Sequence, residues 1–128
     1  RPTLLIVEDN ELNRDILNEI LKDEYKTYLA ENGAEGLRLL RQHSAEIDLV
    51  LLDIEMPVMN GYEATRAIRQ FENKELAQVP IIAMTANAFQ EDKEKALNEG
   101  MDGHVAKPLN VKVVMQTMQE ALLNKGQK

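Results

Sequence analysis

The sequence predicts a doubly wound α/β domain, in which helices cover both faces of a five-stranded parallel sheet. Two observations lead to this prediction. Short apolar runs recur five times along the 128 residues, and segments with helical periodicity lie between them. Strand and helix therefore alternate, which is typical of βα crossovers and parallel strands.

The predicted strands are residues 4–7, 27–30, 49–52, 81–84 and 104–106. The first, third and fourth of these runs are apolar without alternation, as expected for strands that are buried on both faces. The second run contains polar residues and therefore suits an edge of the sheet. The fifth run is the weakest of the set.

Apolar residues three or four positions apart predict the first three helices. These residues are Leu12, Ile16, Leu17, Ile20 and Leu21 for the first helix, Ala34, Leu37 and Leu40 for the second, and Ala64, Ala67, Ile68 and Phe71 for the third. Asn60 and Gly61 open the third helix. Residues 72–79, which follow it, are predicted to form a loop.

The fourth and fifth helices are less alike. The fourth, roughly residues 88–99, is polar with a thin apolar stripe of Phe89, Ala96 and Leu97, and Gly100 is placed to end it. The apolar positions of the fifth helix are Val111, Val114, Met115, Met118 and Leu122. Residues 124–128 are expected to fray.

Composition excludes several classes of function. Asp and Glu number 22 against 15 Lys and Arg, so the net charge is −7. This charge argues against direct contact with nucleic acid or an anionic membrane and favours cations or basic protein patches as partners. The absence of Cys excludes disulfides, thiolate zinc sites and a Cys nucleophile. No apolar run approaches the length of a membrane span or a signal peptide.

The whole chain, residues 1–128, is predicted to be a single domain, since no linker, repeat or low-complexity stretch divides it. Because the chain begins without Met, we expect it to be a piece of a longer multidomain protein. The lack of Cys fits a reducing compartment, and the expected location is the cytoplasm, with the parent protein free to carry a membrane anchor.

Polar side chains gather where the predicted strands end. Glu8 and Asp9 follow the first strand, Asp53 the third, Thr85 the fourth and Lys107 the fifth. In doubly wound sheets this edge is where ligands bind. Taken singly, these residues have ordinary interpretations as turn formers, helix caps or solvated surface. Together, three carboxylates in one place require a compensating cation.

The residue types indicate which cation and which chemistry. Oxygen ligands without His or Cys favour Mg²⁺, with Mn²⁺ as a second choice, over zinc. Lys107 would hold an anionic group beside the metal. A carboxylate nucleophile, a metal, an ammonium and a hydroxyl make a phosphoryl-transfer site.

Four segments of the sequence resemble those of a known protein family. They are residues 4–14 (LLIVEDNELNR), 51–69 (LLDIEMPVMNGYEATRAIR), 80–88 (PIIAMTANA) and 100–109 (GMDGHVAKPL). With them, essentially the whole chain resembles a receiver domain of two-component response regulators. The resemblance implies a flavodoxin-like fold with strand order 2-1-3-4-5 and five helices.

The resemblance also implies the roles of the acidic residues. Asp53 would be the phosphoacceptor, attacking a kinase phosphohistidine to form an acyl phosphate. Asp9 would bind Mg²⁺ directly together with Asp53, and Glu8 would act through water. The backbone carbonyl of Glu55 would complete the metal site, and its side chain would affect dephosphorylation.

The remaining family positions concern the phosphoryl group and the response to it. Thr85, the amide of Ala86 and Lys107 would contact the phosphoryl oxygens, and the peptide bond between Lys107 and Pro108 would be cis. His104 stands where the family more often has Tyr or Phe. It is either a switch residue that moves with Thr85 or a partly exposed strand residue without a special role.

The strings VEDNELNR, MPVMNGYEATRAIR and MTANA resemble receivers of hybrid sensor histidine kinases most. The implied partner is a histidine kinase or a histidine phosphotransfer domain, which docks on the first helix and the loops around the site. Phosphorylation would alter the surface formed by the fourth helix, fifth strand and fifth helix, which could also form a weak homodimer. Two alternatives to a hybrid kinase are that the chain is a stand-alone receiver or a truncated transcriptional regulator.

Two other functions fit the same residues. A haloacid-dehalogenase-like phosphatase also uses a strand-end Asp, Mg²⁺ and a Lys, although it places the nucleophile on its first strand. A pseudo-receiver would serve as an interaction module without phosphorylation. As a receiver, the domain would have at most self-phosphorylation and autodephosphorylation activity, while its parent chain would be a histidine kinase.

Overall fold

The computed structural model describes residues 2–54, 59–85, 90–107 and 110–126, with the backbone alone at 90–92 and 125–126. Its centre is a parallel sheet in the order β2-β1-β3-β4-β5. The strands are β1 (Thr3–Val7), β2 (Lys26–Ala30), β3 (Ile47–Asp53), β4 (Ile81–Thr85) and β5 (Gly103–Ala106). The predicted strand order is confirmed, and each predicted strand is present with boundaries that differ by two residues or fewer.

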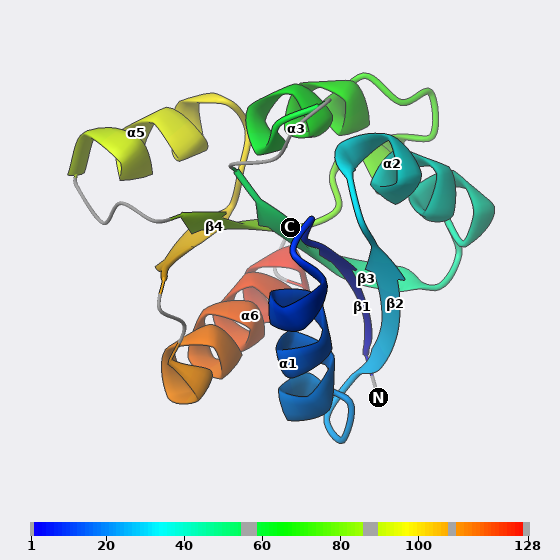
Figure 1. Cartoon of the computed structure of the whole chain (residues 1–128). Coiled ribbons are helices and arrows are strands. Elements are labelled where there is room, and N and C mark those ends of the chain that lie inside the picture. Colours follow the sequence, from blue (N-terminus) through cyan, green and yellow to red (C-terminus); the bar gives the residue numbers. More distant parts are fainter. Residues whose placement is uncertain (1, 55–58, 86–89, 108–109, 127–128) are drawn as a thin grey trace.

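Helices lie on both faces of this sheet. They are α1 (Glu11–Leu21), α2 (Gly33–Gln42), α3 (Gly61–Arg69), α4 (Lys74–Ala77), α5 (Gln90–Asn98) and α6 (Val111–Gly126). Figure 1 shows α1 and α6 together on one face and α2, α3 and α5 on the other. No helix in the described ranges is long and apolar enough to cross a membrane.

Two apolar cores follow from the alternation of side chains along each strand. In β1, Leu4 and Ile6 pack in the core under α1 and α6, whereas Leu5 and Val7 pack in the core under α2 and α3. The neighbouring strands β3 and β4 divide their side chains between the two cores in the same way. Both faces of the central strands are therefore buried, which explains their unbroken apolar sequence.

The predicted loop at residues 72–79 and the prediction of five helices are wrong, because the described residues include a sixth, short helix, α4. The side chain of Asn73 accepts hydrogen bonds from the backbone amides of Glu75 and Leu76, which begins the helix. Leu76 is buried in the core beside α2 and α3. A single apolar residue in a four-residue helix leaves no periodicity for a sequence pattern to detect.

Five apolar positions of the predicted helix stripes are exposed and correct the prediction, namely Leu12, Ile16, Ala34, Leu97 and Val111. Leu12 and Ile16 of α1 are 68% and 48% exposed, whereas Leu17 and Leu21 are buried. In α5, Ala96 is buried but Leu97 is 50% exposed, and Phe89 lies outside the described residues. The α6 backbone is helical to Gly126, beyond the point where fraying is predicted.

Candidate functional site

The carboxyl ends of β1, β3 and β5 bring three charged side chains into contact. The ammonium Nζ of Lys107 lies 3.2 Å from Oδ2 of Asp53 and 3.5 Å from Oε1 of Glu8. Glu8 and Asp53 are each only 1% exposed. These residues, predicted from strand ends far apart in the sequence, therefore form one site.

Backbone hydrogen bonds hold this arrangement, because the sheet pairing continues past the strand ends. The amide of Glu8 donates to the carbonyl of Ala30, and the amide of Lys107 donates to the carbonyl of Thr85 at 2.7 Å. The amide of Ile54, directly after Asp53, donates to Met84. Backbone hydrogen bonds of the sheet therefore fix the positions of Glu8, Asp53 and Lys107.

Asp9 completes a cluster of three carboxylates. One oxygen each from Glu8, Asp9 and Asp53 lie within 4.8 Å of one another. Asp9 is exposed, whereas the other two are buried. Oε2 of Glu8 is buried and has no hydrogen-bond partner among the residues that the structure describes. An oxygen-only cluster with an unsatisfied buried oxygen fits a hard, hydrated divalent cation such as Mg²⁺.

The charges of the cluster also act on Lys107. Burial by itself lowers the pKa of the Lys107 ammonium, but the negative charges of Asp53 and Glu8 outweigh burial. The pKa of Lys107 therefore lies above its ordinary value of 10.5. Lys107 is cationic throughout the physiological range and offsets one of the three carboxylate charges.

Thr85 and His104 lie on the same face of the sheet. Thr85 ends β4, is 3% exposed and pairs with Ala106, while His104 pairs with Ala83 two positions earlier. The side chain of Ala83 packs in the core shared with α3 and α5, so Thr85 and His104 also point to that side. Nε2 of His104 is buried without a partner in the described part of the chain.

Three of the predicted features are outside the described residues. These are the Glu55 carbonyl, the Ala86 amide and the peptide bond between Lys107 and Pro108. Each remains a prediction.

Gly61 and Arg14 belong to the site although sequence reasoning assigned them no part in it. A Cβ on Gly61 would lie 2.7 Å from the carbonyl oxygen of Asp53 and 2.7 Å from Cα of Ile54. Only Gly lets α3 begin this close to the Asp53 backbone. Nη1 of Arg14 donates to the carbonyl of Glu8 at 2.9 Å. The Asn60-Gly61 pair was a signal for Gly61, whereas the segment of residues 4–14 includes Arg14 but does not indicate its contact with Glu8.

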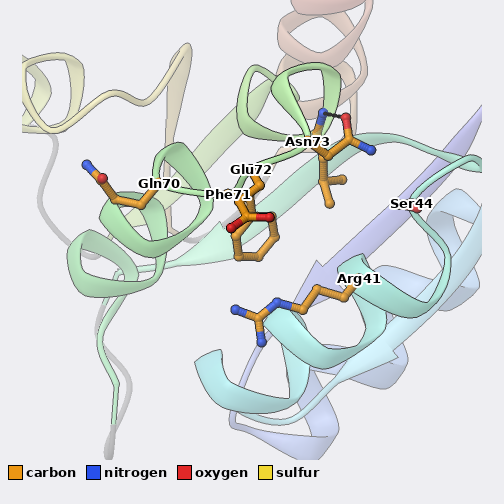
Figure 2. A pocket seen from close by; sticks show the side chains of 7 residues that line it. Arg41, Ser44, Gln70, Phe71, Glu72 and Asn73 are labelled. Atoms are coloured by element: carbon orange, nitrogen blue, oxygen red, sulfur yellow. Dashed lines mark hydrogen bonds between the residues drawn. The ribbon is translucent and has the colours of Figure 1, made fainter.

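A hollow of about 420 Å³ lies between the end of α2 and the segment from α3 to α4. Figure 2 shows Arg41 on one side and Phe71, Glu72 and Asn73 on the other. The Arg41 guanidinium stands 4.8 Å from the centre of the Phe71 ring. None of the residues predicted for phosphoryl chemistry lines this hollow.

With the sheet order and the strand-end site established, the comparison with known families gives a clear result. The sequence matches the response regulator receiver domain over residues 4–119, and the chain belongs to that family. It is thus a receiver domain of two-component phosphorelay signalling. This membership favours the receiver over the phosphatase alternative, which requires a nucleophile on the first strand.

The curated relatives are of two kinds. The chain is 38% identical over 119 residues to hybrid signal transduction histidine kinase I of Dictyostelium discoideum, covering 90% of the chain but only 7% of that kinase. It is 35% identical over 121 residues to the polar-differentiation response regulator DivK of Brucella anthropi, covering 94% of the chain and 95% of DivK. Similar domains thus occur both inside long kinases and as nearly entire proteins.

Two of the similar solved structures are receiver domains with a bound magnesium ion or a bound partner protein. The receiver domain of sensor histidine kinase PA1611 from Pseudomonas aeruginosa, with magnesium in its active site cleft, is 36% identical with a TM-score of 0.82, covering 94% of this chain and 97% of that one. A co-crystal structure of the Saccharomyces cerevisiae phosphotransfer protein Ypd1 and the receiver domain of Ssk1 gives 32% identity and a TM-score of 0.87, covering 98% and 91%.

Proposed function

We propose that Asp53 is the phosphoacceptor of this receiver domain. The observation that carries the proposal is the contact of Lys107 with both Asp53 and Glu8 in a buried acidic cluster. In the transfer, an Asp53 carboxylate oxygen forms a bond to phosphorus while the P–N bond of the donor phosphohistidine breaks. The electron pair of that bond leaves with the imidazole, and Asp53 becomes an acyl phosphate.

The residues around Asp53 have separate tasks in this proposal. Asp9 and Asp53 bind Mg²⁺ directly, Glu8 binds it through water, and the carbonyl of Glu55 completes the set, which Mn²⁺ also fits. The metal, when bound, supplies positive charge that neutralises the phosphoryl and carboxylate oxygens. Lys107 moves from its contact with Glu8 toward a phosphoryl oxygen, because that oxygen carries the stronger negative charge.

The remaining contacts to the product come from β4 and the segment after it. The Thr85 hydroxyl donates to a phosphoryl oxygen, and the Ala86 amide donates to another. When Thr85 turns toward the phosphoryl group, His104 follows it on the same face of the sheet. Contacts that are stronger in the product than in the empty site shift the equilibrium between two conformations.

The conformational change reaches the surface of α5, β5 and α6. Among the described side chains of α5, Ala96 is buried whereas Leu97 is half exposed, so little apolar burial holds this helix in place. This surface is also where we place a weak homodimer. Beryllofluoride, a phosphoryl analogue, is expected to shift the backbone amide resonances of α5 and β5 more than those of α2.

The partner is a histidine kinase or a histidine phosphotransfer domain. Leu12 and Ile16 are exposed apolar side chains one turn apart on α1, the helix that begins two residues after Asp9, and Val111 at the start of α6 is 42% exposed. A helix that carries the donor histidine would cover them. The similarity to the receiver crystallised with Ypd1 supports this choice, and the net charge of −7 supports the absence of direct nucleic acid or membrane contact.

The 38% identical hybrid kinase supports a further proposal, namely that residues 1–128 form one receiver domain within a cytoplasmic part of such a kinase. The domain itself then has at most self-phosphorylation and autodephosphorylation activity.

Intact mass spectrometry after incubation with acetyl phosphate and Mg²⁺ tests the proposal, with Asp53→Asn as the matched variant. We expect one phosphoryl adduct that requires Mg²⁺, is lost in hydroxylamine and is absent from Asp53→Asn. A folded chain that forms no adduct would be a pseudo-receiver, whereas continuous phosphate release without an adduct would support a phosphatase.

A further inference from the structure

Arg14 contacts the backbone of the acidic site, whereas Lys107 contacts its carboxylates. It lies in the first turn and a half of α1, is half-buried, and its Nη1 donates to the carbonyl oxygen of Glu8 at 2.9 Å. Side chains on a helix lean toward its N-terminus, so Arg14 covers the turn between β1 and α1. The carbonyl that it holds belongs to the peptide bond between Glu8 and Asp9.

Asp9 is the carboxylate that most needs such support. Glu8 and Asp53 are buried and both contact Lys107, whereas Asp9 is exposed. Within the described ranges, no hydrogen bond or ion pair holds the Asp9 side chain. Its position relative to the other two carboxylates therefore depends on the backbone that carries it.

The backbone on either side of Asp9 is fixed at separate points. Before it, the Glu8 amide donates to the Ala30 carbonyl. After it, the Asn10 side chain accepts a hydrogen bond from the Asn13 amide and so caps α1. The hydrogen bond from Arg14 fixes the peptide plane between these points, which is the plane that directs Asp9.

We propose that Arg14 is a positioning residue for the cation site, because it holds the Glu8–Asp9 peptide so that the Asp9 carboxylate faces Glu8 and Asp53. This inference rests on the proposed function, in which the carboxylate cluster binds Mg²⁺. Arg14 touches neither the metal nor the phosphoryl group and acts through Asp9.

Because Arg14 is positively charged, its replacement tests the inference by whether Mg²⁺ binding becomes tighter or weaker. The Arg14 guanidinium, which lies 2.9 Å from the Glu8 carbonyl oxygen, repels a cation that enters the site, so removal of its charge alone would tighten Mg²⁺ binding. Loss of the hydrogen bond to Glu8 would instead weaken binding, because Asp9 would no longer be held in place. The two effects of replacing Arg14 therefore have opposite signs.

The experiment is a titration of the ¹⁵N-labelled chain with MgCl₂, followed by NMR in constant ionic strength. We expect Arg14→Met to bind Mg²⁺ about 10-fold more weakly, as is usual when a group that orients a metal ligand is lost. Arg14→Lys should bind within about 3-fold of the unmodified chain, because a single hydrogen bond can be made by an ammonium. Arg38→Met on α2, where Arg38 pairs with Glu35 and Gln42, is the control and should change nothing.

A second readout needs no metal. In the Mg²⁺-free chain, the carbonyl ¹³C resonance of Glu8 should move in Arg14→Met and return in Arg14→Lys, since it reports the hydrogen bond to this oxygen. If Arg14→Met does not fold, Arg14→Ala, which also lacks a side-chain donor, takes its place under the same criteria.

The outcomes separate the inference from the proposed function. If the unmodified chain does not bind Mg²⁺, the metal site proposed above fails and the inference fails with it. If the unmodified chain binds Mg²⁺ and Arg14→Met binds equally well or more tightly, only the inference is overturned. An Arg14→Lys variant that binds as weakly as Arg14→Met also overturns it.

Discussion

Glu8 is held in the site at a cost in stability. Its carboxylate gains one attraction, to Lys107 at 3.5 Å, and meets two repulsions, from Asp9 and Asp53 within 4.8 Å. Since Coulomb energy falls only as the inverse of distance, two repulsions at 4.8 Å or less outweigh one attraction at 3.5 Å. Burial of the unsatisfied Oε2 adds to this cost.

We therefore expect Glu8→Gln to increase the free energy of unfolding by about 1 kcal/mol in the absence of divalent cations, because it removes a buried like charge. In saturating Mg²⁺ the order should reverse, since the unmodified chain binds the ion more tightly. Urea unfolding of both chains with EDTA and with MgCl₂ measures the difference. A variant that is less stable under both conditions would contradict this account of the charges.

Glu46 gives a residue-scale prediction about pH. Its carboxylate accepts hydrogen bonds from the Tyr28 hydroxyl at 2.6 Å and from the Lys26 ammonium at 3.0 Å. Chiefly the bond from Tyr28, and then that from Lys26, lowers the pKa of Glu46 from 4.5 to about 2. A carboxyl group whose pKa is lower in the folded state stabilises the fold above its unfolded pKa, and this contribution is lost as pH falls toward the folded pKa.

Glu46→Gln is accordingly expected to lower the thermal midpoint at pH 7 and to lower it less at pH 3, where the unmodified chain has lost part of the contribution. The control is Glu75→Gln, an exposed position on α4. A difference between Glu46→Gln and the unmodified chain that stays constant from pH 7 to pH 3 would contradict the prediction.

At the scale of the elements, Arg69 joins the end of α3 to two other segments, residues 77–79 and residues 100–102. Its guanidinium donates to the carbonyls of Ala77, Val79 and Gly100 and to the carboxylate of Asp102, over distances of 2.7–2.9 Å. Gly100 has a φ of 102°, which suits Gly and ends the segment after α5. The same Asp102 oxygen also accepts from the Ile81 amide, so the network fixes the beginning of β4.

Arg69→Met should therefore lower the free energy of unfolding by about 3 kcal/mol, because several half-buried carbonyls lose their donor at once. Arg69→Lys should recover little of this, since an ammonium lacks the planar fork that reaches all of them. Arg66→Met is the matched control: Arg66 pairs with Glu99 on the surface, and its loss should cost about 0.5 kcal/mol. Equal losses for the Arg66 and Arg69 variants in urea unfolding would refute the network's importance.

Two features of the helices could not be predicted from sequence patterns. They are the exposure of apolar residues on α1 and the presence of the short helix α4. Leu12 and Ile16 have the spacing of a core stripe, but both side chains are exposed. Periodicity shows that one face of a helix is apolar, but it does not show whether the core or a partner protein covers that face. Both cases give the same sequence pattern. In α4, capping by Asn73 and burial of Leu76 replace periodicity altogether.

At the scale of the whole molecule, the fold was predictable because each physical signal was local. The apolar runs of β1, β3 and β4 marked strands buried on both faces, and the rule for strand ends then grouped Glu8, Asp53 and Lys107. The contact of Arg14 with the Glu8 carbonyl was not predictable, because it depends on a side-chain direction that only the packed helix defines. The hollow beside Arg41 and Phe71 likewise arises from the packing of α2 against the segment after α3.

The central claim is that the molecule brings its strand ends together to make Asp53 a phosphoacceptor. Borohydride reduction of the phosphorylated chain, followed by peptide mass mapping, tests it most directly, because reduction converts an aspartyl phosphate to homoserine at the residue that carried it. We predict homoserine at position 53 and unchanged Glu8 and Asp9. Homoserine at another position, or a phosphoryl group that survives reduction on Thr85 or another hydroxyl, would contradict the claim.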